Sequence, residues 1–100
     1  MDVTRLNQIL APAAVGAQLT ESDAQLLKAI AVGGVSRGSV AMRRAKLTPK
    51  QMIEATKHLV AAGLILADGD TSDDVMIQYA MFSPNPKKIA LVQHGLSIAV

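Results

Sequence analysis

The sequence predicts a single, mainly α-helical domain with a small β-hairpin. A chain of 100 residues is the size of one domain with a modest hydrophobic core. Half of the chain is hydrophobic, but its only aromatic residues are Tyr79 and Phe82. The core must therefore be built from Leu, Ile, Val, Met and Ala, which suits packed helices better than a sheet sandwich. Apolar residues recur at helical spacing in several segments, whereas two short apolar runs after residue 63 indicate strands.

Two helices are expected in the first third of the chain, over residues 3–10 and about 20–33. The first carries apolar residues at helical spacing, namely Val3, Leu6, Ile9 and Leu10. Pro12 ends it, and residues 11–18 form a connector. Thr20 followed by Asp23 is the pattern of a capping box, and Gly33-Gly34 ends the second helix.

A third, short helix is expected over residues 40–45 and a fourth over residues 49–62. Only Lys46, Leu47 and Thr48 separate them. Pro49 suits the first position of a helix, where an N–H would have no partner in the helix. The fourth helix should turn one face to the core, made of Met52, Ala55, Thr56, Leu59 and Ala62. The opposite face should then carry Lys50, Ile53, Glu54, Lys57 and His58.

Strands are expected at residues 64–67 and 75–82, joined by the polar turn DGDTSDD into a two-stranded hairpin. The break Ser83-Pro84-Asn85-Pro86 precedes a last helix over about residues 87–95. The chain therefore divides into an N-terminal helix and connector (residues 1–18), a central unit (residues 19–82), and a C-terminal helix and tail (residues 83–100).

Charge is distributed unevenly along the chain. Between Arg37 and Lys57 a single acid, Glu54, opposes six bases: Arg37, Arg43, Arg44, Lys46, Lys50 and Lys57. The stretch from residue 68 to residue 74 contains four acids and no base: Asp68, Asp70, Asp73 and Asp74. A basic face on a small helical domain suggests that the partner is an anionic polymer.

Several classes of function are not indicated. The chain has no cysteine, which excludes disulfides and thiolate metal sites. The start MDVTRLNQIL lacks the long apolar run of a signal peptide, and no stretch reaches the roughly 20 apolar residues of a membrane span. DGDTSDD lacks the glutamate of a calcium loop, and His58 and His94 lack a nucleophile partner. We therefore expect a cytoplasmic protein that is not an enzyme and has no metal or cofactor.

A short helix, a three-residue turn and a longer helix make a helix-turn-helix, and a hairpin behind the second helix makes it a winged helix. The segments LTESDAQLLKAI, SVAMRRAKLTPKQM and HLVAAGLI carry this pattern. With them, residues 19–82 resemble the DNA-binding core of winged-helix regulators of the MarR and ArsR type. The resemblance implies that residues 1–100 form one winged-helix domain. The chain departs from that family in having Lys46 where the turn usually carries glycine, and in having an acidic wing.

Double-stranded DNA is the partner that these observations favour. A major groove admits an α-helix, and the N-terminal half of that helix reaches the base edges. Gln51 can pair with adenine, Glu54 with cytosine, and Ile53 with a thymine methyl. Arg43, Arg44 and Lys46 are placed for phosphates. The expected DNA-binding residues are Arg37, Arg43, Arg44, Lys46, Thr48, Lys50, Gln51, Ile53, Glu54 and Lys57.

The expected role is that of a small dimeric transcriptional repressor of phage, plasmid or bacterial origin, or of a centromere-binding plasmid partition protein. The alternative is a winged-helix adaptor that binds protein and not DNA. The dimer is inferred from apolar residues in the first and last helices, which would be left exposed if the central unit buried its own core. These residues are Leu6, Ile9, Leu10, Ile89, Val92 and Leu96.

Overall fold

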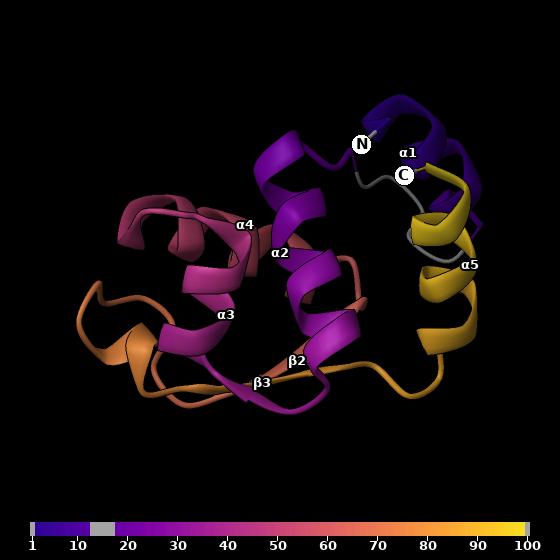
Figure 1. Cartoon of the computed structure of the whole chain (residues 1–100). Coiled ribbons are helices and arrows are strands. Elements are labelled where there is room, and N and C mark those ends of the chain that lie inside the picture. Colours follow the sequence, from indigo (N-terminus) through magenta and orange to yellow (C-terminus); the bar gives the residue numbers. More distant parts are fainter. Residues whose placement is uncertain (1, 13–17, 100) are drawn as a thin grey trace.

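A computed structural model of the chain describes residues 2–12 and 18–99 (Figure 1). Within these ranges the protein is mainly helical, with five α-helices, one 3₁₀ turn and a three-stranded antiparallel sheet. In chain order the elements are α1 (Val3–Leu10), α2 (Glu21–Gly33), β1 (Ser36–Arg37), α3 (Gly38–Ala45), α4 (Pro49–Ala61), β2 (Ile65–Asp68), η1 (Met76–Gln78), β3 (Met81–Pro84) and α5 (Ile89–Ala99). Residues 13–17 of the predicted connector lie outside the described ranges.

The predicted helices are confirmed, and their first turns show why they begin where they do. Asp2 caps α1 by accepting a hydrogen bond from the Arg5 backbone N–H. Thr20 and Asp23 form the predicted capping box of α2. The Asp23 N–H donates to Oγ1 of Thr20 at 3.2 Å, and the Thr20 N–H donates to Oδ2 of Asp23 at 2.9 Å. Two helices differ from the prediction in their boundaries: α3 begins at Gly38 instead of residue 40, and α5 runs from Ile89 to Ala99 instead of over about residues 87–95.

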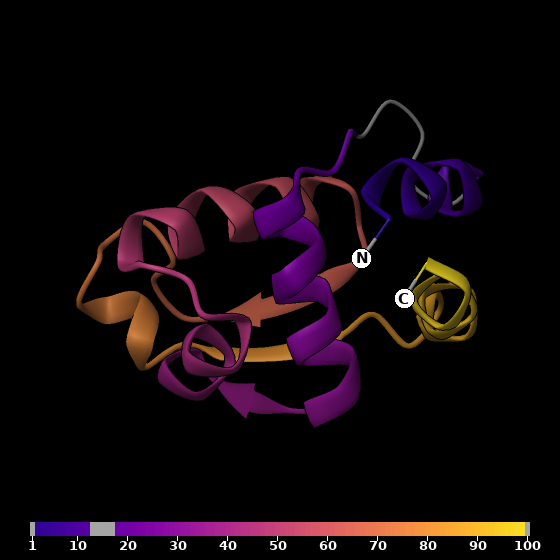
Figure 2. The ribbon, with the colours of Figure 1, turned by 45° about the horizontal axis from the view of Figure 1, so that its top comes forward.

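Helix α2 is the centre of the molecule. It packs against α3 and α4 on one side and α5 on the other, and it covers one face of the sheet (Figures 1 and 2). Its fully buried side chains Leu26, Leu27 and Ile30 join Phe82 of β3 in one hydrophobic core. None of the helices in residues 2–12 and 18–99 combines the length and apolar character needed to span a bilayer.

The prediction of a two-stranded hairpin is wrong in two respects. A third strand, β1, pairs with β3, so the order across the sheet is β1-β3-β2. The second predicted strand, over residues 75–82, is replaced by η1 and by the later strand β3. Phe82 occupies the middle of the sheet, opposite Ser36 on one side and Ala67 on the other.

The segment from residue 69 to residue 80, here called the β2–β3 loop, is shaped by its own polar groups. The Asp73 carboxylate accepts hydrogen bonds from the backbone N–H groups of Val75 and Met76, at 2.8 and 2.9 Å. These bonds stabilise a helical turn, which places Ile77 in the core. The Gly38 N–H then donates to the carbonyl of Ala80 at 2.7 Å. The apolar run that begins at Val75 was predicted as a strand, but it forms a helical turn and becomes a strand only after Ala80.

The terminal helices α1 and α5 lie side by side at the end of the molecule opposite the β2–β3 loop (Figure 1). The Asp2 N–H donates to the Ala99 carbonyl at 2.8 Å. The expectation that this chain leaves the apolar residues of both helices exposed is wrong, because four of them are buried and two half-buried. The buried residues are Leu6, Leu10, Val92 and Leu96, and the half-buried ones are Ile9 and Ile89.

Thr56 offers a test of the core. Its side chain is 1% exposed, and its hydroxyl has no hydrogen-bond partner among the described residues. A buried hydroxyl without a partner destabilises the folded state, because it has lost its hydrogen bonds to water and gained none in the protein. Thr56→Val should therefore raise the free energy of unfolding by about 1 kcal/mol, measured by urea denaturation. Thr56→Ser is the control: it keeps the hydroxyl, loses a methyl group and should destabilise. A Val variant less stable than the parent would show that the hydroxyl has a partner in solution.

Candidate nucleic-acid interface

Helix α4 has one buried side and one polar, solvent-exposed side. Met52, Ala55, Thr56 and Leu59 face the core, as predicted. The exposed side carries Lys50, Gln51, Glu54, Lys57 and His58. Ile53 is half-buried and packs against the core, so only part of its side chain is available to a ligand.

The first turn of α4 is held by a capping box. The Thr48 N–H donates to Oε1 of Gln51 at 2.9 Å, and the Gln51 N–H donates to Oγ1 of Thr48 at 3.2 Å. Two of the predicted DNA-binding side chains therefore also hold the start of the helix. Lys50 is exposed between them and makes no hydrogen bond or ion pair within the described part of the chain.

The turn between α3 and α4 has the conformation that glycine usually provides. Lys46 has φ 58° and ψ 43°, which is left-handed, at a cost of roughly 1 kcal/mol for a residue with a side chain. Its N–H donates to the Arg43 carbonyl, and the N–H of buried Leu47 donates to the Met42 carbonyl. These contacts close the end of α3 and leave the Lys46 side chain in solvent.

The basic residues of this region are exposed, and most of them form no ion pair with an acidic residue. Lys57 lies 3.7 Å from Glu54 on the surface of α4. Within residues 2–12 and 18–99, no ion pair involves any of the other five predicted bases, Arg37, Arg43, Arg44, Lys46 and Lys50. Their positive charge is therefore not neutralised by the protein and remains available to an anion.

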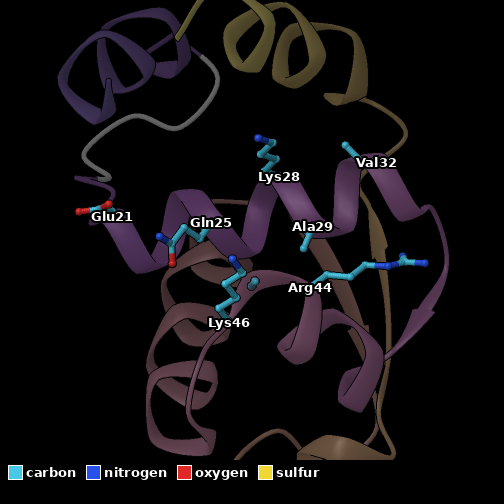
Figure 3. A pocket seen from close by; sticks show the side chains of 8 residues that line it. Glu21, Gln25, Lys28, Ala29, Val32, Arg44 and Lys46 are labelled. Carbon is cyan, nitrogen blue, oxygen red and sulfur yellow. The ribbon is translucent and has the colours of Figure 1, made fainter. Parts of the chain in front are cut away.

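The structure does not bring these five basic residues together on one surface. Arg43 and Lys46 lie at the junction of α3 and α4. Arg44 donates to the Ser36 hydroxyl at 3.4 Å, and its side chain extends toward the C-terminal end of α2 (Figure 3). Arg37 lies at the opposite end of α3, beside Met81 in the sheet. Arg37 is thus separated from the start of α4 by the length of α3.

A groove of about 460 Å³ lies between α2 and the end of α3 (Figure 3). Lys28 from α2 joins Arg44 and Lys46 along it, with Glu21 as the one acid in the lining. Ala29 contributes a buried apolar contact, and Val32 is 79% exposed. Sequence reasoning missed Lys28, because it is distant from the basic segment and nothing local marks it.

His58 is not the isolated surface histidine that the sequence suggests. Its Nδ1 lies 3.1 Å from both carboxylate oxygens of Asp23, and the two side chains are 48% and 1% exposed, respectively. Asp23 also accepts the Thr20 N–H at the start of α2. One buried carboxylate therefore caps α2 and ties it to α4. The capping role was predictable from local spacing, but the contact across 35 residues was not.

A double-mutant cycle tests this tie between helices. Asp23→Ala should lower the free energy of unfolding by about 2 kcal/mol, because it removes a cap and a partner of His58. His58→Ala should cost about 1 kcal/mol, and the two losses should fall short of additivity by about 0.5–1 kcal/mol. Urea denaturation at neutral pH provides all four values. Glu54→Ala, which breaks only the exposed pair with Lys57, is the control and should change stability little. Strict additivity would show that the contact contributes nothing.

The β2–β3 loop and the strand end beside it carry four exposed acids, Asp68, Asp70, Asp73 and Asp74. None of them lies in an ion pair with another described residue. The Ser72 hydroxyl and N–H donate to Asp70 at 2.7 and 2.9 Å, and these hydrogen bonds lower the pKa of that carboxyl below its usual value. The surface is therefore negative at neutral pH.

The described residues include no group of three or more His, Asp or Glu side chains placed to hold a metal ion. Comparison of the chain with protein-family models, with curated proteins and with solved structures found no match.

Proposed function

We propose that the chain is a winged helix-turn-helix protein that binds double-stranded DNA and places α4 in the major groove. The observation that carries the proposal is the exposed polar face of α4. The turn before this helix is flanked by basic side chains that form no ion pair with a described residue. The order α2, β1, α3, α4, β2, loop, β3 also supports it, because it is the order of a winged helix with α1 and α5 added at the ends. The resemblance to MarR and ArsR regulators is part of this proposal.

The proposed roles follow from exposure and partners. Helix α4 has 13 residues and is about 20 Å long, and the major groove, about 12 Å wide, admits such a helix. Lys50 is the first candidate for a base contact, since its amine can donate to guanine O6 and N7. Glu54 can accept from cytosine, and Gln51 retains its amide NH₂ for adenine while its oxygen serves the cap. Arg43 and Lys46 are the candidates for phosphates.

The biological use within this proposal is a transcriptional repressor or a centromere-binding partition protein. A homodimer would set two α4 helices about 34 Å apart, one turn of DNA. Leu6, Leu10, Val92 and Leu96 are buried within the chain, so these side chains are not exposed to form the contact of such a dimer. A protein-binding adaptor is the second candidate, favoured by the acidic β2–β3 loop, which phosphates would repel.

Titration of the protein into labelled duplex DNA tests the proposal. With three or four phosphate contacts, the logarithm of the affinity should fall with the logarithm of the salt concentration with a slope of about −2.7 to −3.6. Raising the salt fourfold should then weaken binding roughly 40- to 150-fold. No binding at low salt, on a pool of random duplexes and on the DNA upstream of its own gene, would reject DNA binding and leave the adaptor.

A further inference from the structure

The second part of the β2–β3 loop, residues 73–80, is held in one shape by several contacts. Asp73 caps the turn η1, and Ile77 is buried in the core beneath it. The Gly38 N–H bonds to Ala80, and a Cβ at Gly38 would overlap the carbonyl of Ile77. The surface that this loop presents is therefore formed before any partner arrives, so little ordering is needed on binding.

That surface combines exposed apolar side chains with acids. Val75, Met76 and Tyr79 in the loop, and Met81 beside it, are each at least 40% exposed. The charged residues near them are the acids Asp68, Asp70, Asp73 and Asp74, with one base, Arg37, beside Met81. Exposed apolar side chains within a polar rim mark sites of protein interaction, and the net negative charge of this rim disfavours DNA as the occupant. A fitting partner must offer both positive charge and apolar contact.

The α2–α3 groove of the same chain offers both. Lys28, Arg44 and Lys46 line it against the single acid Glu21, so its lining is net positive. Val32, 79% exposed, gives the groove an apolar wall. It lies between α2 and α3, and the β2–β3 loop projects beyond α3 and α4 (Figure 1).

We propose that the β2–β3 loop of one copy docks into the α2–α3 groove of a second copy. Val75 and Met76 would contact Val32 and Ala29, while the acids of the loop face the lysines of the groove. Charge complementarity then selects this pairing and orients it. The contact joins two different surfaces, so it is heterologous. It goes beyond DNA binding and does not depend on it.

Sedimentation velocity at low salt, without DNA, tests the contact. The average mass of the parent protein should rise between about 10 and 300 µM, within the range expected of weak self-association. Asp74→Lys, which damages only the loop, and Lys28→Glu, which damages only the groove, should each weaken association at least tenfold. An equimolar mixture of the two variants retains one intact loop and one intact groove, so it should again form complexes of two chains.

Three controls make the result decisive. Lys87→Glu changes charge equally at an exposed site outside the groove and should associate like the parent. Met76→Ser should weaken association without a change of charge, and circular dichroism should show that every variant is folded.

A parent protein that stays monomeric at 300 µM, or association unaffected by both charge reversals, would overturn the proposal. Binding of an Arg-rich test peptide to the loop of a monomeric parent would assign the surface to another protein. Because no DNA is present, failure here leaves the proposed function untouched.

Discussion

Lys50→Ala is expected to lower affinity for a selected DNA site by about 10- to 100-fold, and affinity for a scrambled duplex only a few-fold. The reason is that Lys50 is exposed at the start of α4 without a partner in the described part of the chain, so its amine can pair with a base. Arg43→Ala should instead weaken both duplexes alike and reduce the salt slope by about 1. Fluorescence anisotropy on the two duplexes measures both effects.

Lys87→Ala is the matched control for charge, because it removes one exposed lysine that does not belong to α4. Gln51→Ala is a poorer test, since it also removes the capping-box acceptor for the Thr48 N–H. If Lys50→Ala leaves the selected site unaffected, α4 is not the helix that reads the sequence. If it weakens both duplexes equally, Lys50 contacts phosphate.

Gly38→Ala is expected to lower the free energy of unfolding by about 3 kcal/mol or more, measured by urea denaturation. The new methyl group would overlap the backbone carbonyl of Ile77, which belongs to another element and is anchored by a fully buried side chain. Relief requires the β2–β3 loop to move away from α3. That movement would also break the hydrogen bond from the Gly38 N–H to Ala80.

Gly33→Ala is the matched control, with the same added methyl group. There the methyl would overlap the guanidinium tip of Arg44, which can rotate away at the loss of its long hydrogen bond to Ser36, and would lie 3.1 Å from the Ser36 Oγ. Gly33 is the last residue of α2, where alanine favours the helix by up to about 1 kcal/mol. This variant should be as stable as the parent or slightly more. Equal stabilities for Gly38→Ala and Gly33→Ala would mean that the loop packs against α3 less closely than the structure shows.

Local signals predicted the helices because their ends are set by neighbouring residues. Thr20 with Asp23, and Pro49 after Thr48, mark helix starts through contacts no more than three residues apart. The sequence also places Lys46 where the turn of a helix-turn-helix usually carries glycine, and Lys46 is the residue that adopts the left-handed conformation.

The missed features depend on partners distant in the sequence. Strand β1 is only two residues long and exists because β3 lies beside it. The run from Val75 to Ala80 has the composition of a strand, yet Asp73 and the start of α3 hold it as a turn. The contact between His58 and Asp23 likewise depends on how α4 packs on α2. Periodicity along the chain carries no information about such pairings.

The buried and exposed sides of α4 have a consequence for varying this protein. Its capping residues, Thr48 and Gln51, and its core-facing residues fix where the helix starts and how it packs. Lys50, Glu54 and Lys57 lie on the solvent side and contribute at most one exposed ion pair. These three positions could be randomised together as a library on an unchanged scaffold, and most of its members should fold. Under the proposed DNA-binding role, variants with new DNA sequence preferences could then be selected without first repairing stability.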